Sequence, residues 1–575
     1  MPSQLDQALD TIVTALTAEG QPFVTVPFER GGVEMPAFAG APPTLAHYFA
    51  HFCTQSEHKD AEFLVDGDLR LTFAETYQAA ACVAEGLVTK HGVQKGDRIG
   101  IAARNSANWM ILEMGILMAG GCATLINGFW SGEELAYGIN LCECKIVMAD
   151  AGRAARLEGI EHDSEIVLFH HTGSPAEGLA NVWAVPSDQA SSVAMKTLAT
   201  LTPDDLATIL YTSGSTGNSK GAYSDHRGVV HGVFSYVVQS AMAKVHLEAQ
   251  GEDVSSQPSA LVAVPLFHVT GEVPLFLQSI AIGRKLVLMP KWDAEDAMRL
   301  MEAEKVSYFV GVPLMSYEIA SHPNREKYDL SACKSFAAGG SARPVEHVNK
   351  IRESFPGGFP LLGYGLTETN AVGCGNFNEN YLAKPGSTGT ASKPMVDLAI
   401  LDDDGNKLAQ GDVGEVCIRS VANFLGYWKN EQATADAFTD DQYFRTGDLG
   451  YLDEDGYLYI VDRKKDIIIR GGENISCIEV ENAIYAHPDI AECSVFALPD
   501  ERFVEVPAAV ILTKKGRETV TPEALREFLL KNTAPFKVPM NEHIFVVHET
   551  LPRLGTQKVD KKTLREQYTA KLAAA

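Results

Sequence analysis

Residues 211–221 of the sequence read YTSGSTGNSKG and follow the apolar, strand-like segment LATIL at 206–210. A strand that leads into a glycine-rich loop presents backbone N–H groups to an anion, and glycine lets the backbone approach it closely. The loop lacks the Gly-Lys-Ser/Thr order of a Walker A motif and the G-x-S-x-G order of a nucleophile elbow. On composition alone, a phosphate-binding loop and a flexible surface loop are equally supported.

The composition of the whole chain narrows the classes of partner. With 575 residues the chain is too long for one hydrophobic core, so at least two domains are expected. Its 48 basic and 74 acidic residues give a formal charge of −26, which argues against nucleic acid as a partner because nucleic acids require a cationic surface. The ten cysteines show no paired CxxC spacing, so we expect no zinc site and a reducing, cytoplasmic compartment.

One apolar stretch is long enough to raise the question of a membrane span. Residues 114–132 carry no charge, but glycines interrupt them and Glu113 precedes them. We therefore predict no membrane span, but a buried helix that leads into a short strand at 122–126. The N-terminus shows no pattern of a secretory signal.

The pattern of helical and strand-like segments predicts the fold class. Such segments alternate from about residue 45 to 400, which is typical of α/β layers with parallel strands. After residue 395, short strands surround Asp-Gly turns, as in antiparallel hairpins. We predict an α/β fold with a large N-terminal domain of mixed sheets flanked by helices, a small β-barrel-like part, and a small mobile α+β C-terminal domain.

Four further motifs follow the glycine-rich loop in a fixed order. They are GYGLTETN at 363–370, TGD at 446–448, DRKKDIIIRGGENI at 462–475 and LPRLGTQK at 551–558. Together the five motifs resemble the AMP-forming acyl-CoA synthetase family, in the acyl/aryl-CoA ligase branch of the adenylate-forming ANL superfamily. The resemblance extends from about residue 45 to 566.

The resemblance implies a reaction in two steps at one site. A small-molecule carboxylic acid first attacks the α-phosphate of ATP and gives an acyl-adenylate and pyrophosphate. A thiol, usually that of coenzyme A, then attacks the acyl-adenylate and gives a thioester and AMP. Adenylation replaces an oxide leaving group with AMP, so the enzyme mainly holds two anions together and neutralises their charge.

The resemblance also implies roles for individual residues. Phosphate contacts are expected from Thr212, Ser213, Gly214, Ser215, Thr216, Gly217 and Lys220. The adenine, ribose and acyl-phosphate region is expected to involve Gly339, Gly340, Ser341, Tyr364, Gly365, Thr367, Asp448 and Arg463. Glu368, with Thr216, is expected to hold Mg2+, because a hard cation prefers oxygen ligands. Lys558 is expected to bridge the carboxylate and the α-phosphate, and His268 to lie between the acyl and thiol channels.

Each of these residues also has a purely structural interpretation. Asp448 would then cap a turn, and Glu368 with Thr367 would cap a helix. Tyr364 would belong to the core, and Lys558 would be a solvated lysine. His268 would be a structural histidine, which is the most open of these alternatives.

The motif at 462–475 resembles the family's hinge and thiol-channel loop. It implies an N-terminal AMP-binding domain at 1–464 and a C-terminal domain at 465–575 that rotates at Lys465 between the two steps. The rotation would bring Gly471, Gly472 and Glu473 to the thiol channel. Gln557 stands where the family has glycine before the lysine, so Gly555 is the alternative position for the turn that delivers Lys558.

The acid itself is inferred from Gly365, which stands where acetate-activating relatives have tryptophan. The missing indole predicts room for a medium-chain or long-chain fatty acid or an aryl-alkanoic acid. The far wall of that pocket is expected to include Val269, Phe309, Val312, Ala338, Asn370 and Ala371. Rival functions are an adenylating enzyme that loads a carrier-protein thiol, a luciferase-like oxygenase, and a nucleotide-binding regulator without catalysis. A homodimer is expected from the family alone.

Overall fold

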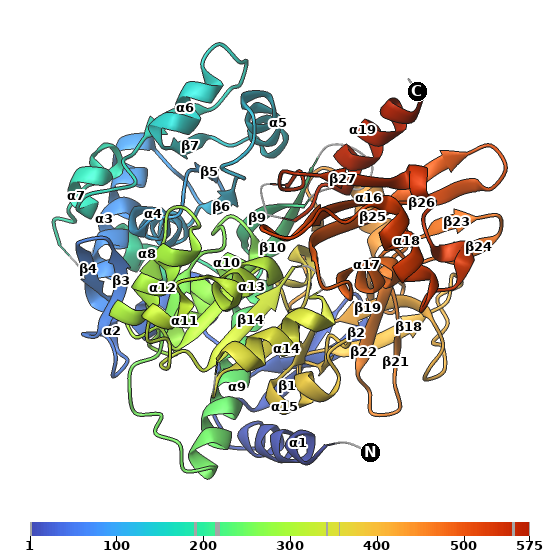
Figure 1. Cartoon of the computed structure of the whole chain (residues 1–575). Helices are drawn as coiled ribbons and strands as arrows, with labels where there is room; N and C mark the ends of the chain where they lie inside the picture. Colours follow the sequence, from blue (N-terminus) through green and yellow to red (C-terminus); the bar gives the residue numbers. More distant parts are fainter. Residues whose placement is uncertain are drawn as a thin grey trace.

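Two large sheets form the centre of the N-terminal part of the molecule (Figure 1). The computed structural model describes residues 3–188, 192–212, 219–340, 343–355, 357–554 and 558–573. The seven-stranded sheet has, in order, β20 (Gly426–Tyr427), β10 (Lys220–Asp225), β9 (Leu206–Thr212), β6 (Cys122–Leu125), β5 (Arg98–Ala102), β7 (Ile146–Ala149) and β8 (Glu165–Leu168). Strands β5 to β9 pair in parallel, as the alternating pattern predicts.

The second sheet has nine strands and carries most of the predicted site. Its order is β17 (Thr390–Ala391), β16 (Cys374–Asn376), β15 (Phe359–Tyr364), β14 (Ser335–Gly339), β13 (Tyr308–Gly311), β11 (Ser259–Val262), β12 (Lys285–Leu288), β3 (Glu62–Asp66) and β4 (Leu69–Thr72). The strands from β3 to β15 in this order pair in parallel. A separate hairpin near the N-terminus consists of β1 (Thr25–Arg30) and β2 (Val33–Phe38).

Helices lie between the sheets and on their outer faces (Figure 1). The helices of the N-terminal part are α1 (Gln4–Leu16), α2 (Leu45–Thr54), α3 (Phe73–His91), α4 (Ala107–Met118), α5 (Gly132–Cys142), α6 (Ala151–Leu157), α7 (Pro175–Gly178), α8 (Val193–Leu198), α9 (His226–Ala249), α10 (Val269–Gly271), the π-helix η2 (Glu272–Leu277), α11 (Gln278–Ala281), α12 (Ala294–Ala303), α13 (Pro313–Ser321), α14 (Val345–Ser354), α15 (Asn378–Ala383) and α16 (Glu431–Ala437).

The predicted buried helix is α4, which leads into β6 as expected. All of its residues are buried, because it lies inside the main hydrophobic core rather than at the surface. Within the described ranges, no helix has both the length and the apolar character that a membrane span requires.

The antiparallel part expected after residue 395 is a four-stranded sheet. Its order is β18 (Asp397–Leu401), β19 (Gly414–Arg419), β21 (Phe444–Leu452) and β22 (Leu458–Arg463). Leu452 pairs with Leu458 across the Asp-Gly turn, which confirms the predicted hairpin. This sheet brings Asp448 of β21 directly opposite Arg463 of β22.

The C-terminal segment forms a sheet of its own, and Figure 1 shows it in orange and red beside the N-terminal part. Its strands are β24 (Glu473–Ile475), β23 (Ile468–Arg470), β26 (Val504–Thr513) and β25 (Ile490–Asp500), with β27 (Ile544–Val547) parallel to β26. The helices α17 (Cys477–Tyr485), α18 (Pro522–Leu530) and α19 (Lys561–Ala573) cover it. This arrangement confirms the predicted α+β character of the tail.

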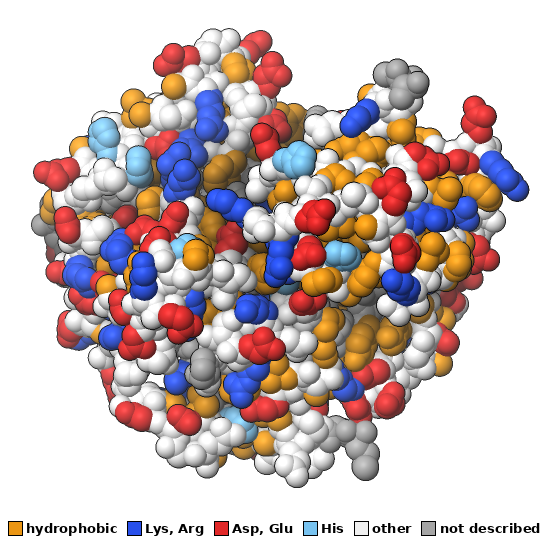
Figure 2. Space-filling model, viewed as in Figure 1, with side chains coloured by type: hydrophobic (Ala, Val, Ile, Leu, Met, Phe, Trp, Pro, Cys, Tyr) orange, Lys and Arg blue, Asp and Glu red, His pale blue; other side chains and the backbone are white. Residues whose placement is uncertain are grey.

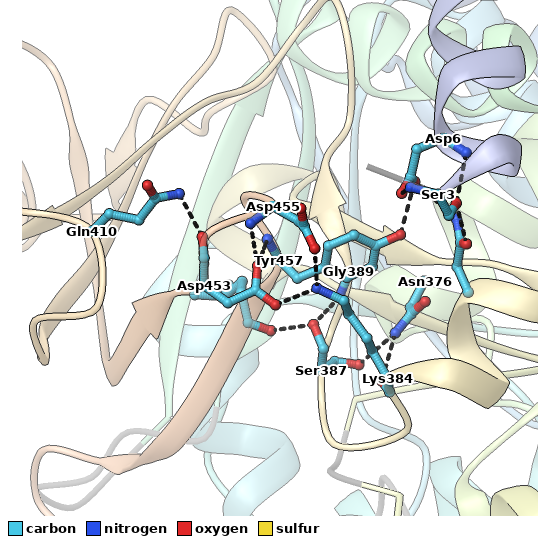
Figure 3. Close-up of polar contacts among 12 residues, drawn as sticks. Ser3, Asp6, Asn376, Lys384, Ser387, Gly389, Gln410, Asp453, Asp455 and Tyr457 are labelled. Atoms are coloured by element: carbon cyan, nitrogen blue, oxygen red, sulfur yellow. Dashed lines mark hydrogen bonds and ion pairs between the residues drawn. The ribbon is translucent and has the colours of Figure 1, made fainter. Parts of the chain in front are cut away.

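A polar network fastens the N-terminal helix to the strands that carry the site (Figure 3). The Asp6 carboxylate of α1 accepts hydrogen bonds from Asn380 Nδ2 and from Tyr457 Oη, both at 2.8 Å. Lys384 forms ion pairs with Asp453 and Asp455 in the turn between β21 and β22. Because Lys384 and Asn380 lie just beyond β16, the network fixes the nine-stranded sheet against the antiparallel sheet.

Two buried carboxyl groups face each other beneath the His268 segment. Glu113 of α4 and Glu272 of η2 are both fully buried, and their oxygens accept no hydrogen bond from the backbone or from any third described side chain. Burial, and the proximity of the two groups, raises the pKa of Glu113, and burial raises the pKa of Glu272. The folded protein therefore retains a proton here that the unfolded chain releases.

We predict that Glu272→Gln stabilises the protein at neutral and alkaline pH. In the natural protein the free energy of unfolding falls as pH rises above about 4.3, by up to about 1.4 kcal/mol per pH unit for one retained proton. The variant removes the part of that slope that Glu272 contributes and leaves the part that the burial of Glu113 contributes, as chemical denaturation over a pH series will measure. Glu133→Gln, at an exposed position of α5, serves as the control. An unchanged slope in Glu272→Gln would contradict this assignment.

Candidate active site

The centre of the site is a carboxylate held between a phenol and a guanidinium. Tyr364 Oη, at the end of β15, donates to Asp448 Oδ2 at 2.7 Å. Arg463 Nε lies 2.9 Å from Asp448 Oδ1. Both oxygens of Asp448 are thus engaged across two sheets, and burial raises the pKa of Tyr364. Asp448 is therefore more than a turn cap, and Tyr364 is more than a core residue, because its hydroxyl binds the Asp448 carboxylate.

Glu368 lies shortly after Tyr364 in the chain and is also buried. Its Oε1 accepts a hydrogen bond from Tyr427 Oη at 2.8 Å, and burial raises its pKa. Thr367 and Glu368 lie in a short 3-10 turn over Thr367–Thr369, so they do not begin an α-helix. The Glu368 carboxylate is therefore fixed in place by a group outside its own turn.

Tyr427, which sequence reasoning missed, connects Glu368 to the end of the glycine-rich loop. It lies in β20, whose pairing with β10 brings its ring within 4.5 Å of Lys220 Nζ. Thr212 and Lys220 face each other as the paired ends of β9 and β10. The only sequence signal for Tyr427 is its place in the short segment LGYW, which no motif marks.

Lys558 reaches this cluster from the C-terminal part of the chain. Its Cε lies 3.2 Å and its Nζ 3.6 Å from the point that a Cβ at Gly340 would take. Gly340 has φ of +79°, which favours glycine, and Gly339 pairs with Gly363 in the adjacent strand. Burial, with the nearby Arg463 charge, lowers the pKa of Lys558 to about 8, although Asp448 and Glu368 act in the opposite direction. Lys558 is therefore not a solvated lysine.

His268 lies at the start of α10, within reach of the Lys558 charge. Its Nδ1 accepts a hydrogen bond from Thr270 N at 3.3 Å, so the side chain caps this short helix. Burial, and secondarily the Lys558 charge, lowers its pKa to about 3, which keeps the imidazole neutral. The capping contact agrees with the structural interpretation and engages only the Nδ1 atom of the ring.

An apolar face of the nine-stranded sheet extends away from Gly339 and Gly363. Because successive side chains of a strand alternate between faces, Val310, Ala337 and Leu361 share this face, towards α9 and η2. Phe309 and Ala338 were expected in the pocket wall, but they belong to hydrophobic clusters on the opposite face. The strand period is the physical reason for this correction.

The interpretation of Gly365 is also corrected. A Cβ at this position would lie 2.0 Å from the carbonyl oxygen of Ala371. Glycine is therefore required here by backbone packing, and its missing side chain opens no space by itself. Asn370, another expected wall residue, donates instead to Ala422 O at 2.7 Å and is fully buried.

Some predicted residues lie away from this cluster or outside the described residues. Gly471, Gly472 and Glu473 are exposed at the β23–β24 hairpin, and Lys465 is exposed between the two parts of the chain. Outside the described residues lie Ser213, Gly214, Ser215, Thr216, Gly217, Ser341, Gly555 and Gln557.

The surface is hollowed between the N-terminal and C-terminal parts, and Lys and Arg side chains lie along this hollow (Figure 2). The buried carboxylates of Asp448 and Glu368 meet the partly buried Lys558 and the exposed Arg463 at the ends of the parallel strands. The carboxyl ends of parallel strands are a common location for ligand sites. The arrangement suits a polyanionic nucleotide whose ribose hydroxyls donate to a carboxylate and whose phosphates meet cations.

Comparison with known proteins identifies two family models in the chain. The model described as AMP-binding enzyme matches residues 52–428, and the model described as AMP-binding enzyme C-terminal domain matches residues 479–558.

Similar proteins include enzymes whose names state an activity. The chain is 31% identical to a long-chain-fatty-acid–CoA ligase of Bacillus subtilis, over 87% of this chain and 90% of the relative. It is 30% identical to 4-coumarate–CoA ligase-like 4 of Oryza sativa, over 91% of this chain and 93% of the relative.

Two solved structures show the same architecture. ATP-bound MatB from Rhodopseudomonas palustris superposes with a TM-score of 0.75 at 26% identity, over 91% of this chain and 99% of that chain. A fatty acyl CoA synthetase of Mycobacterium tuberculosis superposes with a TM-score of 0.68 at 28% identity, over 92% and 99%. The chain therefore belongs to the family of AMP-binding enzymes, in the acyl- and aryl-CoA ligase branch of the adenylate-forming superfamily.

Proposed function

We propose that the protein is an ATP-dependent carboxylate–CoA ligase that forms an acyl-adenylate and then an acyl-CoA thioester. The observation that carries the proposal is the position of Lys558. A lysine from the C-terminal part lies against Gly340, beside the Asp448, Glu368 and Arg463 charges of the N-terminal part. Two anionic substrates brought together at this point would need such a cation between them.

The first half-reaction uses the residues gathered at the ends of β14, β15, β21 and β22. The Asp448 carboxylate accepts from the ribose hydroxyls of ATP, with Arg463 beside it. Lys558 bridges the substrate carboxylate and the α-phosphate, which brings the attacking oxygen close to phosphorus and offsets the charge repulsion. Lys220 and the residues of the glycine-rich loop bind the other phosphates.

The buried Glu368 carboxylate fits a divalent cation, because it supplies hard oxygen ligands and Tyr427 holds one of its two oxygens in place. Glu368, together with Thr216, would hold Mg2+, which supplies positive charge to the departing pyrophosphate. Among the described residues, no cluster of three metal-binding side chains forms a complete protein cage. This agrees with a cation that is held partly by phosphate oxygens.

The second half-reaction requires a different position of the C-terminal domain at 465–575. Lys558 occupies the site in this structure, whereas Gly471, Gly472 and Glu473 lie exposed on the β23–β24 hairpin. Rotation at the exposed Lys465 would withdraw Lys558 and bring the hairpin to the thiol channel. The neutral His268 would then lie between the acyl group and the thiol of coenzyme A.

The acid substrate is a medium-chain or long-chain fatty acid or an aryl-alkanoic acid. Support comes from the apolar face that carries Val310, Ala337 and Leu361 and begins at the Gly339–Gly363 pair. The names of the relatives, which state long-chain fatty acid and 4-coumarate as substrates, support the same class of acid. The expected homodimer stays a prediction from the family.

Pyrophosphate release from Mg-ATP tests the proposal as a whole. The acid panel runs from acetate to stearate and includes cinnamate and phenylpropanoate. We expect release that depends on the acid and becomes multiple-turnover only with coenzyme A. A carrier-protein loader would not respond to coenzyme A, and a regulator would release no pyrophosphate with any acid. More efficient turnover of acetate than of octanoate would contradict the substrate class.

Replacement of Lys558 separates the two half-reactions. We expect Lys558→Ala to lower adenylation by at least about a hundredfold, because the transition state loses a buried cation. Thioester formation from supplied acyl-adenylate and coenzyme A stays close to the natural rate, because Lys558 is withdrawn in that step. Lys562→Ala, at an exposed neighbour, is the control. Equal losses in both half-reactions would refute the assignment to adenylation alone.

The pH dependence of adenylation reports the same lysine. The pKa of Lys558 in the free enzyme is about 8, and only the protonated form bridges two anions. We therefore expect kcat/KM for ATP to fall roughly tenfold per pH unit above that pKa. In Lys558→Arg the guanidinium stays charged, so the alkaline decline disappears even if the rate is lower. The same decline in both enzymes would assign it to another group.

A further inference from the structure

A buried guanidinium lies at the far end of the apolar face of the nine-stranded sheet. Arg284, between α11 and β12, is only 5% exposed. Burial lowers its pKa, and among the described residues no carboxylate lies close enough to form an ion pair with it. A buried charge without a counter-ion is costly, so it calls for an explanation.

The contacts of Arg284 leave most of its hydrogen-bonding capacity free. A guanidinium has five N–H donors. Within the described parts of the chain, Arg284 makes one side-chain hydrogen bond, a long one of 3.4 Å from Nη1 to Gln278 Oε1, and Nε has no acceptor. Its Cζ lies 4.6 Å from the centre of the Tyr308 ring. The group is therefore positioned by an aromatic ring and an amide but not neutralised.

Arg284 lies in line with the predicted acyl position. Tyr308 begins β13 on the same face as Val310, and it pairs with Ser335 of β14. Gly339, at the site, is four residues further along β14, which corresponds to about 13 Å at 3.3 Å per residue. A chain that starts at the Gly339–Gly363 pair and follows this face therefore ends at Tyr308 and Arg284.

Hydrogen bonds connect Gln278, beside Arg284, to Tyr236 and through it to the backbone near Gly365. Gln278 Nε2 donates to Tyr236 O and to Ser240 Oγ, both at 2.7 Å. Tyr236 Oη in turn donates to Ala371 O at 2.5 Å, the carbonyl that closes off Gly365. Tyr236 and Tyr308 are only partly buried, although both pack against the main core. The polar contacts thus extend from Gln278, beside Arg284, back to the Ala371 carbonyl near the site.

We propose that Arg284 binds a second carboxylate at the far end of the acid, so that the preferred substrates are α,ω-dicarboxylic acids with an apolar chain about 13 Å long. This inference rests on the proposed ligase function and narrows its substrate class. A carboxylate matches the fork of a guanidinium and supplies the missing counter-charge. The apolar side chains between Gly339 and Tyr308 suit the methylene chain that separates the two carboxylates.

The test compares each dicarboxylic acid with the monocarboxylic acid of equal chain length. The pairs are suberate with octanoate, sebacate with decanoate, and dodecanedioate with dodecanoate, and kcat/KM is measured by coenzyme A-dependent pyrophosphate release. We expect the dicarboxylic acid to be preferred in at least one pair. In Arg284→Met and Arg284→Gln, the ratio of the two kcat/KM values should fall about tenfold to a hundredfold, with the monocarboxylic acid retained as substrate.

Arg343 offers a matched control on the other face of the same sheet. It is also 5% exposed and lies over the Tyr381 ring, and its Nε and Nη1 have no hydrogen-bond partner among the described residues. We expect Arg343→Gln to leave the ratio unchanged. A preference for the monocarboxylic acid at every length in the natural enzyme would overturn the inference, as would equal ratios in Arg284→Gln and the natural enzyme. No release with any acid would instead overturn the proposed function itself.

Discussion

The attraction between the Lys558 ammonium group and two buried carboxylates is the interaction on which the site depends. Asp448 and Glu368 belong to the N-terminal part, and Lys558 comes from the C-terminal part. Burial and the Arg463 charge disfavour the protonated form of Lys558, whereas the two carboxylates favour it. The balance leaves a cation that loses its proton readily in the free enzyme and that substrate anions would stabilise further.

The surrounding architecture serves to fix the two carboxylates. Asp448 is held by the register of β21 against β22 and by Tyr364 of another sheet. Glu368 is held by Tyr427, whose strand joins the seven-stranded sheet. The network of Figure 3 joins α1 to the turn between β21 and β22, so the start of the chain also contributes to the position of Asp448. Preorganised charges of this kind need no rearrangement when the reaction begins.

The sequence predicted the main features of the fold because its local signals are strong. The alternation of segments indicated parallel α/β layers, and the Asp-Gly turn indicated the hairpin of β21 and β22. The motifs identified Tyr364, Asp448, Arg463, Glu368 and Lys558, which the structure brings together. Their roles in the reaction stay predictions.

Features that depend on contacts distant in the sequence were not predictable. Tyr427 supports Glu368 through strand pairing, which no local pattern encodes. Gly365 was interpreted as an opening in the pocket, but the Ala371 carbonyl fills the position of its side chain. Phe309 and Ala338 were assigned to the wrong face because the phase of a strand is set by its register. Nothing in the sequence marks Arg284, because its charge becomes unusual only through its burial in the fold.

The central claim is that a carboxylate oxygen attacks the α-phosphate of ATP at the Lys558 site. The most direct measurement uses acid labelled with oxygen-18 in the carboxylate and mass spectrometry of the nucleotide product. After thioester formation, an attack at the α-phosphate leaves one labelled oxygen in AMP and none in pyrophosphate. Label in inorganic phosphate or pyrophosphate, or unlabelled AMP, would contradict the claim and place the chemistry elsewhere.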